Sequence, residues 1–402
     1  MDRLVHDMRM LTGLSLACGN AKDSACFHTG LAREVLMVDD RIIDAPLPIT
    51  ASSLYDLASL TKLFTAIAVM QLVEGGRLSL DDRIGEKDSR FKHLKDTSLF
   101  EALCYLAVLR SPERIDRQPD AASARAQVFE VYRDRGLEPD KLYSDMNALV
   151  LKYLVERVSG LGFYDYLQRH VLAPCGMRET YVKVPAERLE DCLDYSLEHR
   201  LIAGQHQLLT APRGLPHDPK ARLLGQGGQD LSGHAGLFSS LQDMVKLAQG
   251  LLQGALLKRD TLLQMGTDRT GRHGRGLKYR QFLGFLCFSK SPVQRLSELP
   301  AFMGRRAMGL SGYTGNHFAL DPELQVFDVF LGNRCHNRLA VIEPAEQAQA
   351  LGLSPEGAGQ ISWPDGRQVN SSWHYIHQKD ALLHQPVHRY LREQGWIHSQ
   401  ED

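Results

Sequence analysis

Residues 55–62 read Tyr55-Asp56-Leu57-Ala58-Ser59-Leu60-Thr61-Lys62, and an apolar pattern follows them as far as Gly75-Gly76. Its apolar side chains recur at helical spacing, at Leu63, Ile67, Met70 and Leu72. This pattern predicts an amphipathic, centrally placed helix that begins near Ser59 and ends at a glycine stop. Because positions i and i+3 share one face of a helix, we expect the Ser59 hydroxyl within hydrogen-bond reach of the Lys62 amine.

A serine hydroxyl beside a lysine amine has the arrangement of a nucleophile and its base. The positive end of the helix dipole disfavours a protonated Lys62 and favours an oxyanion near Ser59, and acyl transfer needs both effects. The spacing alone is a weak signal, because the chain repeats it at Ser89-Arg90-Phe91-Lys92 in a charged stretch. The alternative is a helix-capping serine followed by a solvated lysine. No G-x-S-x-G, P-loop or H-E-x-x-H motif competes with this interpretation.

The composition excludes several classes of protein. The chain has 402 residues, of which 43% are hydrophobic and 24% charged, so we expect a soluble globular protein rather than a disordered or fibrous one. The 47 Lys and Arg residues nearly balance the 48 Asp and Glu residues, so neither nucleic acid nor a membrane is an expected partner. Seven cysteines without C-x-x-C spacing predict buried, reduced thiols. Without a recognisable secretory signal or membrane span, the expected location is the cytoplasm.

The order of the patterns predicts an α/β (α+β) architecture. Residues 10–45 alternate like antiparallel strands, and strand-like stretches return at Phe282–Phe288, Asn316–Leu320 and Gln325–Leu331. Helical periodicity dominates residues 98–230 between them. We therefore expect a sheet domain built from residues 1–84 and 233–402, with a mainly helical domain inserted at residues 85–232.

A second motif, Tyr143-Ser144-Asp145-Met146-Asn147, precedes a predicted helix. With residues 55–62, it resembles the serine β-lactamases of class C type and their penicillin-binding, esterase and peptidase relatives. The resemblance continues in collinear order over most of residues 50–340. It runs through Val155–Gly160, Leu172–Thr180, His217-Asp218, Ser232–Ser239, Gly312–Gly315, Asp321–Glu323 and Gly332–His336.

This resemblance implies an antiparallel sheet flanked by helices, as in the β-lactamase and transpeptidase fold, with a set of catalytic roles. It implies that Ser59 is the acylated nucleophile, that Lys62 is its hydrogen-bond partner and base, and that Tyr143 is the second proton-transfer group. The oxyanion hole would be the backbone N–H groups of Ser59 and Tyr313, with Gly312 allowing close approach of the strand.

Three positions depart from the family pattern. The third motif, usually Lys or His, then Thr or Ser, then Gly, is Leu310-Ser311-Gly312, so its cation is missing. Asp145 stands where the most studied lactamases have Asn, and its charge would stabilise a protonated Lys62 against the helix dipole. Residues 105–108 replace a His-Thr-Ser-Gly loop beside the site with apolar residues. We interpret Asp145, Leu310, Ser311 and Gly312 as substrate-binding positions in a reshaped, more apolar pocket.

The predicted function is a serine hydrolase that cleaves a small ester, amide or peptide through an acyl-enzyme. No cofactor or metal is expected, because Pro386 interrupts the histidines at positions 374, 377, 384 and 388 and no ligand set is complete. An acyltransferase and a catalytically inactive ligand-binding relative are the alternatives. The segment from Arg338 to Trp373 has no family counterpart and is a candidate to cover the site, and the oligomeric state stays open.

Overall fold

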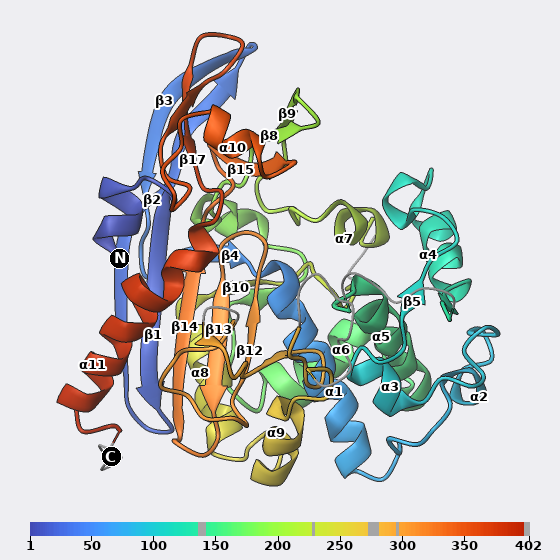
Figure 1. Cartoon of the computed structure of the whole chain (residues 1–402). Coiled ribbons are helices and arrows are strands. Elements are labelled where there is room, and N and C mark those ends of the chain that lie inside the picture. Colours follow the sequence, from blue (N-terminus) through green and yellow to red (C-terminus); the bar gives the residue numbers. More distant parts are fainter. Residues whose placement is uncertain (136–141, 227–229, 272–280, 295–296, 398–402) are drawn as a thin grey trace.

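The computed structural model describes residues 1–135, 142–226, 230–271, 281–294 and 297–397. An antiparallel sheet of seven strands, in the order β11-β12-β13-β14-β1-β2-β3, forms its centre (Figure 1). The strands are β1 (Gly13–Asn20), β2 (Ser24–Val38), β3 (Arg41–Pro48), β11 (Phe288–Ser289), β12 (Met308–Ser311), β13 (His317–Asp321) and β14 (Val326–Gly332). Because β1 pairs with β14, the beginning of the chain and its last third share one sheet.

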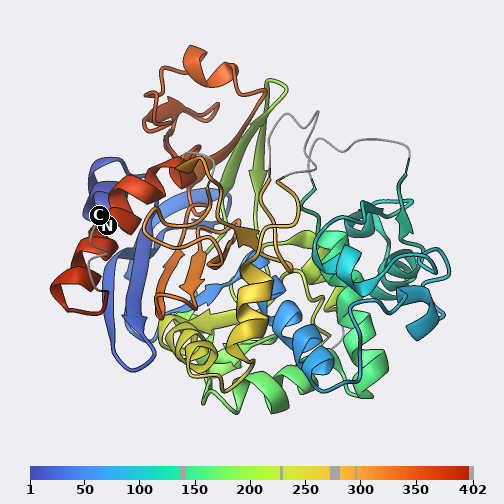
Figure 2. The same cartoon turned by 60° about the horizontal axis from the view of Figure 1, so that its bottom comes forward.

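Both faces of this sheet are covered. Side chains of β1 alternate between the two sides, as the period of a strand requires. Ala17 faces the core that contains α1 (Thr61–Glu74), whereas Leu16 faces the C-terminal helix α11 (Gln385–Glu393). Figure 2 shows α11 along the outer side of the sheet, with the helices of the middle segment on the other side.

Helix α1 lies between the sheet and a layer of helices. It follows a 3₁₀ turn, η2 (Ala58–Leu60), and it contacts α5. The helices that follow it along the chain are α2 (Ile84–Lys87), α3 (Leu99–Leu103), α4 (Ala121–Phe129), α5 (Asp145–Ser159), α6 (Phe163–Leu167), α7 (Pro219–Leu224), α8 (Leu241–Leu252) and α9 (Arg259–Gly266). Ser144 caps α5 by accepting the N–H of Met146, and Gly160 ends it in the left-handed conformation. Capping by Ser144 therefore sets where α5 begins, and Asp145 is its first residue.

Smaller sheets cover the rest of the fold. A five-stranded sheet joins β8 (Glu198–Ile202) and β9 (Gln205–Leu209) to β15 (Arg338–Glu343), β16 (Gln360–Ser362) and β17 (Gln368–Ser371). Within it, β15 pairs in parallel with β8, so the segment that begins at Arg338 is joined to the middle of the chain. A three-stranded sheet holds β4 (Leu54–Asp56), β10 (Phe238–Ser240) and β7 (Thr180–Tyr181), and β5 (Leu109–Arg110) pairs with β6 (Tyr132–Arg133).

The structure confirms several predicted elements. The strands expected at Asn316–Leu320 and Gln325–Leu331 are β13 and β14, and the helix expected after the Tyr143 motif is α5. The predicted central position of the helix after Ser59 is also correct, because α1 is buried between the sheet and the other helices. Among the described residues, every helix is too short or too polar to traverse a lipid bilayer.

Other expectations differ from the structure. Helix α1 is not amphipathic, because every side chain from Thr61 to Met70 is buried between sheet and helices. Helix α3 ends at Leu103, since Tyr105 takes the left-handed conformation (φ 59°). The middle segment also contains strands β5 to β9, and of the seven cysteines, Cys26 is exposed and Cys175 half-buried. The two-domain division by residues stays a prediction.

The burial of α1 leads to a stability prediction. Ile67 is fully buried in its middle, whereas Val73 near its end is half-buried. We expect Ile67→Ala to lower the free energy of unfolding by about 3 kcal/mol, because the layers on both sides cannot collapse into the cavity. Val73→Ala, the control on the same helix, should cost about 1 kcal/mol. Urea denaturation of both variants measures this, and equal losses would contradict the central position of α1.

Candidate active site

Ser59 lies in the tight turn η2 between β4 and α1. The residue before it, Ala58, has φ 47°, a left-handed conformation that costs a residue with a side chain about 1 kcal/mol or more. Asp56 holds this turn, because its Oδ1 accepts the N–H of Ala58 at 2.9 Å. The carbonyl of Asp56 accepts hydrogen bonds from Thr314 Oγ1 (2.8 Å) and Asn316 Nδ2 (2.7 Å). The turn that contains Ser59 is therefore tied to the turn that joins β12 and β13.

The Lys62 amine is buried directly behind the Ser59 hydroxyl. Its Nζ donates to Ser59 Oγ at 2.9 Å and to the carbonyl of His234 at 3.2 Å, and it lies 2.8 Å from Asp145 Oδ1. Burial alone lowers the pKa of Lys62, but the Asp145 charge, with a further contribution from Tyr143, raises it above the ordinary value. The charge of Asp145 therefore outweighs burial, and Lys62 rests as an ammonium group.

Asp145 lies between two lysines. Lys220 Nζ contacts its Oδ2 at 2.6 Å, and Lys62 occupies its Oδ1. Burial raises the pKa of Asp145, but the charge of Lys62 and the neighbouring cations hold it well below the ordinary range. Lys220 also lies 3.7 Å from Asp218, whose Oδ1 contacts His234 Nε2 at 3.1 Å. Charges of alternating sign thus continue away from Ser59.

Two other aromatic rings pack against the ring of Tyr143 at the site. Its ring stacks on Phe288 (centroids 5.5 Å apart, planes at 9°) and lies 5.4 Å from the ring of Tyr105. Lys62 Nζ lies 4.9 Å from the centroid of the Tyr143 ring. The structure therefore brings together Ser59, Lys62, Tyr143 and Asp145, and Tyr105 comes from the segment that departs from the family pattern.

The third motif places its residues on opposite faces of β12. Leu310 is fully buried in the core beside α1, in the position of the missing cation. The Ser311 hydroxyl bonds to Glu298 at 2.9 Å and Lys379 at 3.1 Å, on the side of the C-terminal segment. Gly312 allows close approach, because a Cβ there would lie 2.7 Å from the Leu57 carbonyl. Substrate binding by these residues stays a prediction, and neither Leu310 nor Ser311 lines the cavity at Ser59.

A cavity of about 230 Å³ opens at Ser59, and Asp145, Arg200, His217 and Tyr313 line it. Sequence reasoning assigned no role here to Arg200 or Lys220. Arg200 lies on β8, which pairs with β15 from the last part of the chain. His217 did lie in a segment of family resemblance. No local spacing pattern signals these residues, because each reaches Ser59 from another part of the chain.

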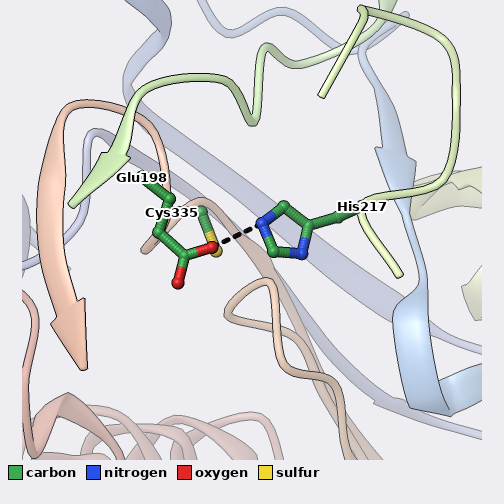
Figure 3. Close-up of side chains that lie close together, drawn as sticks. All are labelled: Glu198, His217 and Cys335. Carbon is green, nitrogen blue, oxygen red and sulfur yellow. Dashed lines mark ion pairs between the residues drawn. The ribbon is translucent and has the colours of Figure 1, made fainter. Parts of the chain in front are cut away.

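His217 belongs to a buried ion pair. Its Nε2 lies 2.5 Å from Glu198 Oε2, with Cys335 beside both (Figure 3). Burial lowers the pKa of His217, but Cys335 and Glu198 together raise it to about 10. Arg200 donates to the same carboxylate through Nε (2.8 Å) and Nη2 (3.2 Å). Two cations therefore share one carboxylate, which leaves positive charge in excess at this end of the cavity.

Among the residues that the structure describes, two groups of side chains have the residue types of a metal site. They are Glu198, His217 and Cys335, and Asp145, Asp218 and His234. In the first group Arg200 already neutralises the carboxylate, and in the second the lysines beside Asp145 do so. A divalent cation would have to displace these charges, so the donor sets favour ion pairs over a metal. Of the C-terminal histidines, His384 instead contacts Asp328 at 2.8 Å.

Comparison with known proteins connects this geometry to one family. A family model described as Beta-lactamase matches residues 32–352. The Escherichia coli (strain K12) protein named "Putative D-alanyl-D-alanine carboxypeptidase" is 26% identical over 328 residues, which are 74% of this chain and 73% of that protein.

Two solved structures share the fold. EstCE1, described as a hydrolase with promiscuous acyltransferase activity, has a TM-score of 0.61 at 17% identity, over 83% of this chain and 91% of that chain. A class C beta-lactamase in complex with cefoxitin has a TM-score of 0.60 at 15% identity, over the same 83% and 91%. At these identities the likeness concerns the fold alone. It agrees with the predicted fold class.

The contact between Asp145 and Lys62 predicts a change in pH dependence. In Asp145→Asn the opposing charge disappears, so burial lowers the pKa of Lys62 and its amine becomes free at lower pH. The pH of half-maximal Ser59 acylation, measured from the rate of fluorophosphonate labelling, should therefore fall. Asp218→Asn is the control, because Asp218 pairs with Lys220 and His234 rather than with Lys62, and its midpoint should move less. An unchanged midpoint in Asp145→Asn would contradict control of Lys62 by Asp145.

Proposed function

The chain belongs to the beta-lactamase family of serine hydrolases, and from that premise we propose that it cleaves an ester or amide through an acyl-enzyme on Ser59. The observation that carries this proposal is the buried Lys62 ammonium 2.9 Å from the Ser59 hydroxyl. Burying a charged lysine is costly unless it is paired, and here it is paired with Asp145, which lines the cavity at Ser59. Such an arrangement is typical of a site that moves protons.

In the proposed reaction, Ser59 Oγ bonds to the substrate carbonyl carbon while Lys62, in its amine form, accepts the hydroxyl proton. Because Lys62 rests as an ammonium, only the fraction of molecules that has released this proton can react. Tyr143 then passes a proton to the departing alcohol or amine. Water cleaves the resulting ester by the reverse sequence and restores Ser59. The oxyanion would be held by the backbone N–H groups of Ser59 and Tyr313.

Arg200 favours one substrate class within this reaction. Its Nη1 makes no hydrogen bond with the described residues, its side chain is 23% exposed, and it lines the cavity. A substrate carboxylate can therefore bind there without displacing the Glu198 pair. This agrees with the carboxypeptidase activity in the relative's name, since a peptide C-terminus carries a carboxylate. A carboxypeptidase is thus a second candidate beside a general esterase. Arg200 would then take the place of the cationic residue that the third motif lacks at position 310.

The nucleophile can be tested with two serines of identical spacing. We expect fluorophosphonate, a penicillin or a p-nitrophenyl ester to add one acyl or phosphonyl group to the intact protein, and Ser59→Ala to abolish the adduct. Ser89→Ala is the matched control, because Lys92 pairs with Glu130 instead of a serine, and labelling should persist. The absence of any adduct in folded wild type would favour the inactive binding relative. Partition of the acyl group between water and an added alcohol separates hydrolysis from acyl transfer.

The role of Arg200 can be tested with a substrate pair. We expect Arg200→Gln to raise KM about tenfold for a peptide ester with a free carboxylate, because a charge-assisted hydrogen bond is lost. When that carboxylate is blocked as a methyl ester, the same variant should change KM by no more than about twofold relative to wild type, since the substrate then carries no charge for Arg200 to bind. Steady-state kinetics of both substrates measure the difference. Equal changes for the two substrates would contradict a carboxylate site at Arg200.

A further inference from the structure

Beyond the residues that react, the carboxylate of Glu198 occupies an unusual position. It is fully buried at the start of β8, and its two oxygens contact three other side chains. Oε1 accepts from the Tyr313 hydroxyl at 2.5 Å and from Arg200 Nε at 2.8 Å, and Oε2 lies 2.5 Å from His217 Nε2. Burial raises the pKa of Glu198, but His217 and then Arg200 lower it to about 2. The group is therefore a permanent anion.

One branch from Glu198 leads to the strand side of the cavity. Tyr313 follows Gly312 at the end of β12, and its residue is 37% exposed, so burial does not immobilise its ring. Interactions hold it instead: it stacks on His217 (centroids 5.4 Å apart, planes at 22°), and Arg334 lies 4.8 Å from its centroid. The hydrogen bond to Glu198 fixes the far end of this ring. The backbone at Tyr313 is therefore held through its side chain.

The other branch leads to the turn that contains Ser59. His217, oriented by Glu198, donates its backbone N–H to Asp56 Oδ2 at 2.6 Å. The second oxygen of Asp56 accepts the N–H of Ala58, the strained residue next to Ser59. A continuous chain of contacts thus runs from Glu198 through His217 and Asp56 to the Ser59 turn. Both branches therefore start at the carboxylate of Glu198.

We propose that Glu198 is a positioning residue that clamps the Ser59 turn and the Tyr313 backbone at a fixed separation. The clamp rests on the proposed function for its chemical purpose, because the N–H groups of these two residues are the expected oxyanion donors. Donors held in advance at the developing charge lower the barrier without a reorganisation cost. The carboxylate comes from β8 in the five-stranded sheet, so this sheet supports the site although Glu198 is shielded from the cavity.

The test compares two carboxylates that each pair with an arginine. Glu198→Gln keeps the shape but removes the charge that binds Arg200 and His217. Glu34→Gln is the matched control, because Glu34 accepts hydrogen bonds of 2.7 Å from both terminal nitrogens of the buried Arg338. Glu34 contacts neither Ser59 nor Tyr313. Hydrogen exchange of segments 54–62 and 308–320, followed by mass spectrometry, reports the clamp directly. Circular dichroism checks that each variant folds.

We expect Glu198→Gln to accelerate exchange in both segments, and Glu34→Gln to leave both unchanged. The kcat of ester cleavage should fall about tenfold in Glu198→Gln with KM within about threefold, because misplaced oxyanion donors affect the transition state more than the bound substrate. Tyr313→Phe keeps its backbone N–H and severs one branch, so it should loosen segment 308–320 alone. This variant keeps the proposal falsifiable if Glu198→Gln fails to fold.

Unchanged exchange in both segments of Glu198→Gln would overturn the clamp, as would an equal loss of kcat in Glu34→Gln. If folded wild type forms no adduct at Ser59 while Glu198→Gln loosens both segments, the clamp stands and the hydrolase function fails. If wild type reacts at Ser59 but Glu198→Gln retains full kcat and exchange, the function stands and the clamp fails. Exchange and acylation therefore separate the two proposals.

Discussion

The buried ion pair between Lys62 and Asp145 is the constraint on which the site depends. An ammonium group without access to water is tolerated only beside an opposite charge. Lys62 lies on α1 and Asp145 opens α5, so their 2.8 Å contact requires the two helices to meet at these ends. Tyr143, two residues before Asp145, is carried to the same place. A second cation, Lys220 of α7, then completes the pairing of Asp145.

The ion pair between Lys62 and Asp145 changes the charge state of the lysine beside Ser59. The helix dipole at the start of α1 favours a neutral amine, as does burial. The charge of Asp145 outweighs burial, so the resting lysine is protonated. In the proposed reaction a proton must therefore leave Lys62 first.

Asp56 links the Ser59 turn to the rest of the fold. Its side chain holds the strained Ala58, and its carbonyl accepts hydrogen bonds from the turn between β12 and β13. The five-stranded sheet reaches the same point from outside, through Glu198 and His217. Strain next to Ser59 persists because contacts from several distant segments determine that conformation together. The segment after Arg338 contributes by pairing β15 with β8.

The sequence by itself determined the local features of this protein. The spacing of Ser59 and Lys62 predicted their contact, since helical geometry depends only on neighbouring residues, and collinear motifs identified the family and its fold. Only the tertiary structure decided that Ser311 faces Lys379, that Arg200 lines the cavity while Lys220 pairs with Asp145, and that Lys62 is charged. These properties follow from pairings between distant segments, and a charge state depends on distances that no local pattern contains.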